Sequence, residues 1–344
     1  MKKTLLLVIA TLAIGTLYAQ NEIAILKHND NLSAFYGTSA LIEAMDSAVA
    51  GDVITLSSGS FGCSRVKKGV TVRGNGFEED LVAGGVMPTK VILQTSSWSS
   101  YIPFSDSSIV EGIKFMSPVS LQGTKDVQIS KCYLGIDMSM SLRVVIVGCY
   151  ITDGNTSSST DAIISNSIAY LRHGATALQV MNSIITCEYN YLYNGNYGTF
   201  TNCIVMDNTS NNTQTACYNC IGINLGSSTN GFFANAINHL EFQNMTQAQQ
   251  DSVMAAADVS HGNYNASSLD EVFQTYRGGD YATRQNYSLT TAFDTLISNL
   301  GVYNGMMPYT PFVNRPRYVR TNASPRTTLD GKLSVDIQVV TAEE

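Results

Sequence analysis

The sequence predicts an all-β protein with the architecture of a parallel β-helix, a solenoid with an N-terminal capping helix and a short helical excursion near the C-terminus. Three observations favour this fold. Short apolar segments recur every 16–20 residues between residues 107 and 222. Each segment alternates apolar and polar positions, as strands do, and asparagine stands at the same place in four of them. The chain has 344 residues, more than one compact core usually supports, which also suits a solenoid.

Residues 1–19 have the features of a signal peptide. Lys2 and Lys3 precede an apolar run that extends to Ala19, which is the order of a charged head and a short apolar middle. We therefore expect cleavage near Ala19 and a secreted or cell-surface protein, with the periplasm as the alternative. No later run approaches the ~20 apolar residues of a membrane helix, so no membrane span is expected.

Residues 20–50 are expected to form an N-terminal cap that includes a helix over 38–50. Thr38 or Ser39 is a suitable N-cap residue. A solenoid exposes apolar interior at its first turn, and an amphipathic helix would cover it. The expected apolar face is Leu41, Ile42, Met45 and Val49.

The repeat predicts two strands per turn over residues 51–235. Within each segment the apolar alternation shifts by one residue just before a key position, which indicates a bend between two short strands. Each strand would then pair with its equivalent in the next turn, ~4.8 Å away. The key positions are residues 113, 132, 149, 167, 183, 203 and 220.

Asparagine and cysteine columns accompany the bend. The residue before the key position is Asn166, Asn182, Asn202 or Asn219 in four segments, and asparagine tolerates the left-handed backbone of a corner. Cysteine or serine fills the key position itself, so we expect stacked interior thiols rather than disulfides. A redox or zinc role for the Cys217-x-x-Cys220 pair is the alternative. The column is Cys132, Cys149, Ser167, Ser183, Cys203 and Cys220.

Two motifs at the start of the repeat carry a resemblance to a known superfamily. Residues 51–61 read G-D-x-I-x-L-x-x-G-x-F and residues 70–76 read V-T-V-R-G-N-G. This opening, with the ladder that follows, resembles secreted bacterial proteins of the pectin-lyase-like superfamily. The resemblance implies a right-handed single-stranded parallel β-helix. It implies no single activity, because such proteins include polysaccharide lyases, glycoside hydrolases and adhesins.

Residues 236–344 are expected to hold the final turns, a helical excursion and a C-terminal cap strand. Thr246 and Gln249 form a capping box for a helix to residue 257. Residues 300–305 resemble the G-x-Y-x-G stretch that finishes the solenoid in secreted bacterial β-helix proteins. Residues 332–340 alternate as a strand, expected at the edge of the solenoid or as its cap.

Catalytic candidates were sought among charged residues at equivalent places in successive turns. Enzymes with this fold use calcium-binding acids with a basic residue, or two or three acids close together. Residues four or five positions beyond the key position would lie near one edge, although an exposed turn position is the simpler interpretation of each. The candidates are Asp137, Asp153, Arg172, Glu188 and Asp207.

A second candidate site is a row of tyrosines that alternates along the chain. Alternate tyrosines of one strand would face the same side and form a stacking surface for sugar rings. Ordinary stacked side chains covering the ladder are the alternative. The row is Tyr189, Tyr191, Tyr193 and Tyr197.

Charge and composition narrow the function. The net charge is −7, with no basic stripe, which argues against nucleic acid. We expect a glycan or another extracellular polymer as partner, bound along a flat sheet without catalysis. A polysaccharide lyase or glycoside hydrolase is the first alternative, and a structural or adhesive surface protein is the second. No cofactor or metal is expected, and calcium would enter only with a lyase.

Overall fold

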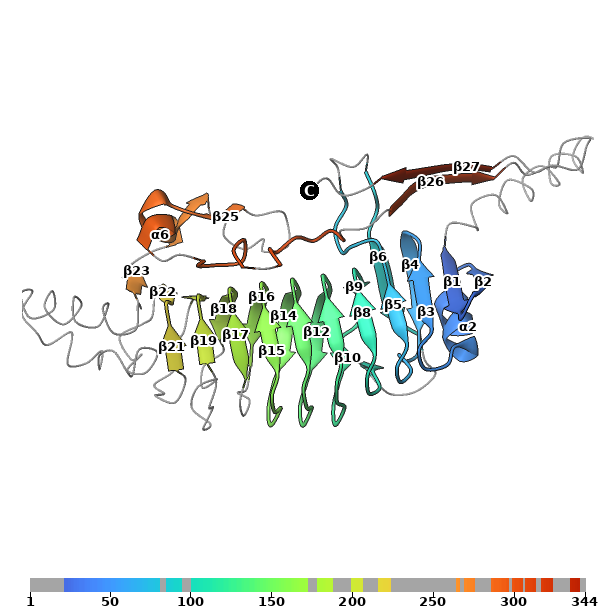
Figure 1. Ribbon diagram of the computed structural model, residues 1–344, viewed down its shortest axis with the longest axis horizontal. Coiled ribbons are helices and arrows are strands. Elements are labelled where there is room, and N and C mark those ends of the chain that lie inside the picture. The colour runs from blue at the N-terminus through green and yellow to red at the C-terminus, as the bar shows by residue number, and fades with distance from the viewer. Residues whose placement is uncertain are drawn as a thin grey trace, which may run out of the picture.

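The computed structural model shows a parallel β-solenoid of about seven turns (Figure 1). It describes residues 22–80, 85–94, 100–172, 178–187, 199–206, 216–223, 264–266, 269–275, 286–296, 299–305, 307–313, 317–323 and 335–340. Along the chain a strand of one long sheet alternates with a strand of a second. Each strand pairs in parallel with its equivalent in the next turn. The predicted repeat is therefore confirmed.

The first long sheet, sheet A, has eleven strands and begins with an antiparallel hairpin. From β3 onward all of its pairs are parallel, and a three-residue strand is the usual contribution of one turn. In spatial order the strands are β2 (Asn31–Tyr36), β1 (Ile23–His28), β3 (Val53–Leu56), β5 (Thr71–Arg73), β8 (Ile109–Glu111), β11 (Gln128–Ser130), β13 (Val145–Val147), β15 (Ile163–Ser165), β17 (Gln179–Met181), β19 (Thr199–Thr201) and β21 (Ala216–Tyr218).

The second long sheet, sheet B, has twelve strands, and its pairs are parallel. Two short strands, β7 (Ile102–Pro103) and β10 (Val119–Ser120), join it beside β12. Its main path runs through β4 (Gly59–Cys63), β6 (Thr89–Leu93), β9 (Lys114–Phe115), β12 (Tyr133–Asp137), β14 (Tyr150–Asn155), β16 (Ile168–Leu171), β18 (Ile184–Cys187), β20 (Ile204–Met206), β22 (Ile221–Ile223) and β23 (Tyr264–Ala266).

The core is a set of stacked aliphatic columns between the sheets. The middle residue of each three-residue strand in sheet A points inward and is at most 2% exposed from Val72 to Phe200. Registered pairs such as Ile129 with Ile146 place like side chains on like in adjacent turns. Burial of one such side chain stabilises the fold by about 1.5–3 kcal/mol, so the columns explain why the interior is so uniform.

The bend between the two sheets is made by residues in the left-handed region. The predicted asparagines have φ values between 46° and 55°, where an asparagine costs less than other residues with a Cβ. In earlier turns Gly112, Lys131 and Gly148 take the same place with φ values of 68°, 51° and 64°. The structure confirms the predicted corner in each of the four asparagine turns.

The key positions after the corner form a hydrogen-bonded column inside the solenoid. Ser167 donates its hydroxyl to the carbonyl of Ser165 at 2.8 Å and accepts the Cys149 N–H at 3.0 Å. Cys149 repeats the pattern with sulfur, donating to Val147 at 3.4 Å and accepting from the Cys132 N–H at 3.4 Å. The side chain therefore satisfies polar backbone groups of two turns. Five cysteines of the described part are buried free thiols, as expected: Cys63, Cys132, Cys149, Cys203 and Cys220.

The predicted N-terminal helix is α2 (Ala40–Ser47), which packs beside β1–β4. Its buried face includes Leu41 and Met45, as expected. Ser39 is the N-cap residue but makes no side-chain capping hydrogen bond. Val49 is 52% exposed because the helix ends at Ser47, so its predicted place on the apolar face was wrong.

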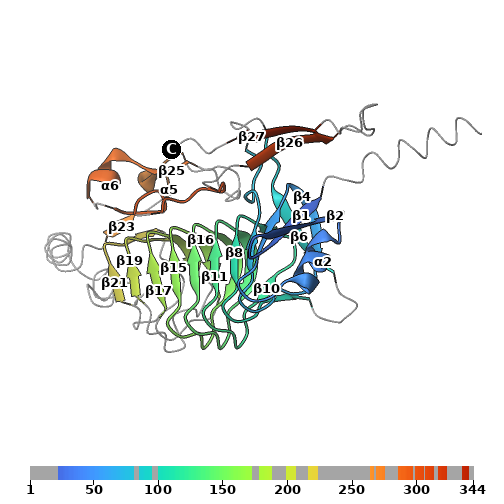
Figure 2. The same cartoon turned by 45° about the vertical axis from the view of Figure 1, so that its right-hand side comes forward.

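After residue 236, β23 adds one more parallel strand to sheet B, and the described residues beyond it do not continue the solenoid. Strand β24 (Phe273–Thr275) pairs antiparallel with β25 (Asn286–Leu289), between the short helices α5 (Leu269–Val272) and α6 (Thr291–Leu296). Residues 299–305 and 307–313, here called the strap, then run back along the solenoid (Figures 1 and 2). The G-x-Y-x-G stretch lies in this strap and not in a final turn, contrary to expectation.

The last predicted strand is present as β27 (Val335–Val340). It pairs antiparallel with β26 (Arg317–Ala323) in a separate two-stranded sheet. The expected place at the edge of the solenoid is therefore wrong for the described residues. The helix predicted over 246–257 lies outside them. Within the described ranges, no helix has the length and apolar character needed to cross a membrane.

Candidate functional site

The outer face of sheet A is an open, uncharged surface across five consecutive strands. In β11, β13, β15, β17 and β19 the first and third residues point outward and are partly or fully exposed. None of these ten side chains is charged, although the whole chain carries −7. They are Gln128, Ser130, Val145, Val147, Ile163, Ser165, Gln179, Met181, Thr199 and Thr201.

The surroundings of this face define its extent. In Figure 2 no coloured segment lies in front of these strands. At one end Tyr218 of β21, in register with Thr201, is 43% exposed. At the other end Arg73 and Glu111 form an ion pair of 3.7 Å on neighbouring strands. An uncharged strip therefore lies between an aromatic side chain and an ion pair, with strands repeating every ~4.8 Å.

Charges are placed along the rim of this face. Arg143 donates from Nε and an Nη to the two carboxylate oxygens of Asp126 in the preceding turn, at 2.7 and 2.9 Å. Both residues occupy left-handed corners just before β11 and β13. The guanidinium lowers the pKa of the Asp126 carboxyl by hydrogen bonding, and the carboxylate raises the pKa of Arg143 in return. Paired in this way, the two charges leave the face itself neutral.

Two of the predicted catalytic residues lie together as an ion pair. Arg172 contacts both carboxylate oxygens of Asp153, and one of the contacts is 2.7 Å long. The side chains are 37% and 48% exposed and belong to adjacent turns of sheet B. Among the described residues, no other carboxylate makes an ion pair with Arg172.

The third described candidate, Asp137, is a turn residue. Its Oδ1 accepts the N–H of Ser139 at 3.0 Å and the side-chain amide of Asn155 at 3.2 Å. Asn155, its register partner, accepts the N–H of Ser157 in the same way, and Ser120 accepts that of Gln122. The alternative stated for these positions, a turn role, therefore applies to Asp137. Polar residues that recur about every 18 residues can be turn residues as well as catalytic ones, so the recurrence alone does not distinguish the two roles.

The remaining candidates lie outside the described residues. Glu188 and Asp207 follow directly after β18 and β20, where the description of the chain stops. The tyrosine row, Tyr189, Tyr191, Tyr193 and Tyr197, belongs to the same interval between β18 and β19. These predictions therefore stay untested.

The outer face of sheet B differs from that of sheet A because the C-terminal segment covers much of it. Ile168, Ile184, Ile204 and Ile221 form a registered outward column. They are at most 4% exposed, in one cluster with side chains of the strap that include Leu300 and Val302. The sequence pattern shows this apolar column, but not the segment that covers it.

Tyrosines continue the same column toward the N-terminal turns. Tyr133 and Tyr150 are register neighbours whose rings stack with centroids 5.2 Å apart and an interplanar angle of 5°. Phe77 packs against Tyr133 at 6.3 Å and against Tyr309 of the strap at 6.4 Å. Burial raises the pKa of Tyr309 well above its usual value. These ring faces are occupied by one another and are not a platform for sugar.

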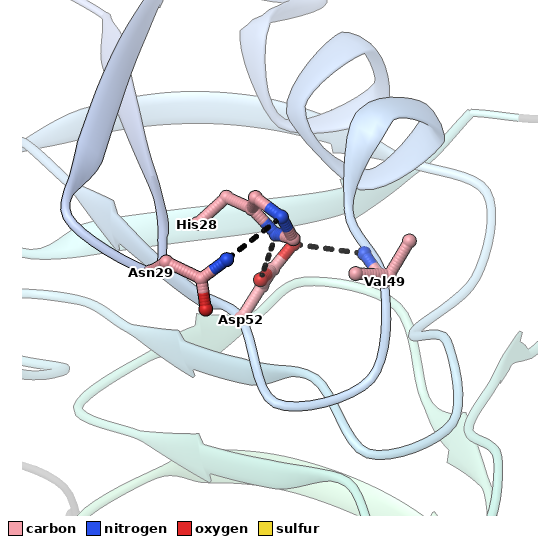
Figure 3. Close-up of polar contacts among 4 residues, drawn as sticks. All are labelled: His28, Asn29, Val49 and Asp52. Atoms are coloured by element: carbon pink, nitrogen blue, oxygen red, sulfur yellow. Dashed lines mark hydrogen bonds and ion pairs between the residues drawn. The ribbon is translucent and has the colours of Figure 1, made fainter.

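A buried carboxylate and a histidine form a polar cluster that the sequence did not reveal (Figure 3). Asp52 is 4% exposed and accepts the Val49 N–H at 2.9 Å, and its other oxygen lies 2.8 Å from Nδ1 of His28. The Asn29 amide donates to Nε2 of His28 at 3.2 Å. Burial works to raise the pKa of Asp52, but the contacts with Val49 and His28 outweigh it, so the pKa is lowered.

This cluster connects two parts of the chain. Both ring nitrogens of His28 make hydrogen bonds, Nδ1 with Asp52 and Nε2 with Asn29. The contacts join the hairpin of β1 and β2 to the turn before β3. No sequence signal other than the residue types could have found this pair, because 24 residues separate its members.

No metal site occurs in the part of the chain that the structure describes, and three of its thiols are buried with raised pKa values. No group of three or more histidine, cysteine or acidic side chains is arranged there to hold a metal ion. Burial raises the pKa of Cys63 to about 12 and those of Cys132 and Cys203 well above the usual value. Such thiols are poor nucleophiles and poor metal ligands.

Comparisons with known proteins add no family. No protein-family model, no curated protein and no solved structure matches this chain.

Proposed function

We propose that this protein binds an extended neutral glycan along the outer face of sheet A, without catalysis. The observation that carries the proposal is the uncharged open strip from β11 to β19. Sugar chains present hydroxyls beside apolar C–H faces. The strip offers the matching groups, since the hydroxyls and amides of Ser, Thr and Gln alternate there with Val and Ile.

Exposed Tyr218 supports the same proposal at one end of the strip. A tyrosine that is 43% exposed on a sheet offers a flat apolar face and a hydroxyl. The regular rise of ~4.8 Å per strand suits a partner that is itself regular and long. A binding surface of this kind needs no acid cluster.

The handedness of the solenoid, its capping and the location of the protein are also proposed. We propose that the solenoid is right-handed and related to the pectin-lyase-like superfamily, which the left-handed asparagine corners support. Helix α2 would cap its first turn, supported by the buried Ala40, Leu41, Ala44 and Met45. Secretion is proposed from the signal-like residues 1–19. Cleavage near Ala19 would be seen by mass spectrometry of the exported chain.

The test is affinity electrophoresis of the protein in gels that contain neutral polysaccharides. Retardation is expected for the wild type, and Val147→Arg, which places a charge in the middle of the strip, should abolish it. Tyr218→Ala should weaken binding about tenfold, the effect of a contact worth about 1.4 kcal/mol. Met140→Arg is the matched control, because Met140 is 58% exposed on a loop outside the strip.

The same samples distinguish the alternatives. New reducing or unsaturated ends that disappear in Asp153→Ala would make the protein a hydrolase or lyase and overturn the proposal. Equal retardation of Val147→Arg and Met140→Arg would move the binding site elsewhere. Absence of retardation and of product over the whole panel would favour a structural or adhesive protein.

A further inference from the structure

Two lysines stand in register on the outer face of sheet B. Lys90 of β6 and Lys114 of β9 are partners in a parallel pair, and both are partly buried. Their backbones are therefore about 4.8 Å apart. Like charges at facing positions of neighbouring strands destabilise a sheet, so this arrangement costs free energy while no ligand is bound.

No acid relieves the repulsion within the part of the chain that the structure describes. Neither lysine has an ion-pair partner there, although acids outnumber basic residues in the chain, 27 to 20. The carboxylate of Glu22 contacts the N–H of Ser60, the register partner of Lys90 on the preceding strand. Glu78 lies near Tyr309 and contributes to raising the pKa of that tyrosine.

The neighbouring side chains add donors and hold one ammonium in place. In the next turn the register partner of Lys114 is Tyr133, and Nζ of Lys114 lies 4.8 Å from the centre of the Tyr133 ring. Stacking on Tyr150 and packing against Phe77 fix that ring in turn. The lysine stem is therefore ordered before any ligand arrives, which lowers the entropy cost of binding.

We propose that Lys90, Lys114 and Tyr133 form a binding site for a tetrahedral oxyanion, the sulfate or phosphate ester group of an acidic glycan. A tetrahedral anion presents oxygens in several directions and can accept from both ammoniums and the tyrosine hydroxyl together. A planar carboxylate has only two oxygens in one plane. The site belongs to sheet B and does not depend on the glycan surface proposed for sheet A.

Thermal unfolding in sodium sulfate tests the site directly. Sulfate stabilises proteins in general through exclusion from their surface, an effect that rises steadily with concentration. A specific site adds a saturable rise in Tm, expected to be about 3 °C at low millimolar sulfate. Lys90→Gln with Lys114→Gln should lose the saturable part and keep the general one. Lys125→Gln, at an exposed lysine outside the two long sheets, is the control and should behave as wild type.

Two controls show whether a lost response is due to misfolding: a variant that keeps the positive charge, and the melting temperature without sulfate. Lys90→Arg should keep the saturable response. Without sulfate the double glutamine variant should melt at the same temperature as wild type or higher, because a repulsion has been removed. A saturable response of equal size in the double variant, or its absence from wild type, overturns the proposal.

Polymer columns identify the source of the anion. Dextran sulfate should retain the wild type and the Lys125→Gln control, but not the double variant, and inorganic phosphate competing better than sulfate would indicate phosphate esters. Equal retention on alginate, which carries carboxylates, would contradict the tetrahedral preference. Retention on a neutral dextran column should not depend on the two lysines. It therefore tests glycan binding by sheet A separately.

Discussion

At the scale of single residues, the interior column explains why either cysteine or serine occupies the same position in successive turns. Each side chain donates to the carbonyl two residues before it, and Cys149, Ser167 and Ser183 also accept an N–H from the turn before. A thiol and a hydroxyl both provide one donor and one acceptor of similar size. What the column selects is therefore a small side chain that is both donor and acceptor.

The column leads to a prediction about Cys149. We expect Cys149→Ser to change the free energy of unfolding by less than about 1 kcal/mol, because serine keeps both hydrogen bonds. Cys149→Val has a similar volume but leaves the Cys132 N–H and the Val147 carbonyl unsatisfied, at a cost of about 1–3 kcal/mol. Urea unfolding of the two variants measures the difference. Equal destabilisation by serine and valine would show that volume, and not hydrogen bonding, governs the site.

Asp52 gives a second residue prediction, for the dependence of stability on pH. Its pKa is lowered in the folded protein, so its contribution is complete above the unfolded value of about 3.9 and is lost as the pH falls through the folded value. Asp52→Asn should therefore destabilise by about 1 kcal/mol at pH 7, and less at pH 3. Urea titrations at both pH values test this. The same pH trend in Asp30→Asn, on the exposed hairpin turn, would refute it.

At the scale of elements, the asparagines at the corners have two structural roles. They turn the backbone between the sheets, and two of them also hold the strap. The Asn166 side chain donates to the carbonyls of Val302 and Asn304, and the Asn182 side chain donates to that of Asn299. Gly301 donates its N–H to the carbonyl of Asn202. One residue type thus links the solenoid to a segment more than 95 residues later.

This double role predicts unequal effects of the same substitution. Asn166→Ala and Asn219→Ala both place alanine at a left-handed φ, 46° and 53°, which costs about 1–2 kcal/mol. Asn166→Ala also removes the bonds to the strap and should cost roughly 1 kcal/mol more. Denaturant unfolding gives the two costs. Limited proteolysis should cleave the strap faster in the Asn166 variant alone, and equal rates would contradict the role in fastening.

The sequence allowed the repeat, the corner and the thiol column to be predicted because the residue types that form them recur at equivalent positions in several turns. A strand pattern such as that around Ile129 or Ile146 recurs at fixed spacing, so one turn confirms the next. The strap has no such repetition. Its contact between Asn166 and Asn304 joins residues 138 apart, and nothing local in residues 299–313 indicates where they dock.

The candidate site was harder to predict for a related reason. Of the charged residues expected to converge, Asp153 and Arg172 do lie together, whereas Asp137 accepts the N–H of Ser139 in its own turn. Glu188 and Asp207 lie outside the described residues. The uncharged strip on sheet A is defined by the absence of charged side chains at its ten outward positions. It can be identified only when the structure shows which residues point outward.

At the scale of the whole molecule, one sheet face is open and the other is largely covered. The isoleucine column of sheet B, from Ile168 to Ile221, would be a long exposed apolar stripe without the C-terminal segment. The strap extends over it from the turn of Asn202 to that of Gly76, where Phe77 donates its N–H to Pro311. Covering this stripe leaves sheet A as the extended surface available to a polymer.

Because the strap buries the isoleucine column, a charge placed between them should destabilise the contact. Val302 is 1% exposed in the strap, and Val302→Asp would bury an unpaired carboxylate, at a cost of about 3 kcal/mol or more unless the strap lifts. We expect increased binding of a hydrophobic dye and self-association on size-exclusion chromatography. Met307→Asp, at a residue 48% exposed in the same strap, is the control. Dye binding equal to that of the control would show that the strap does not seal the stripe.

The return path of the strap also changes how the solenoid is expected to unfold. In a stack of turns each turn touches only its neighbours, so the ends fray and turns can melt one after another. Here the strap touches turns from Gly76 to Asn202, so losing one turn weakens contacts made by several others. We therefore expect the strap to make the turns that it contacts unfold together as one cooperative unit.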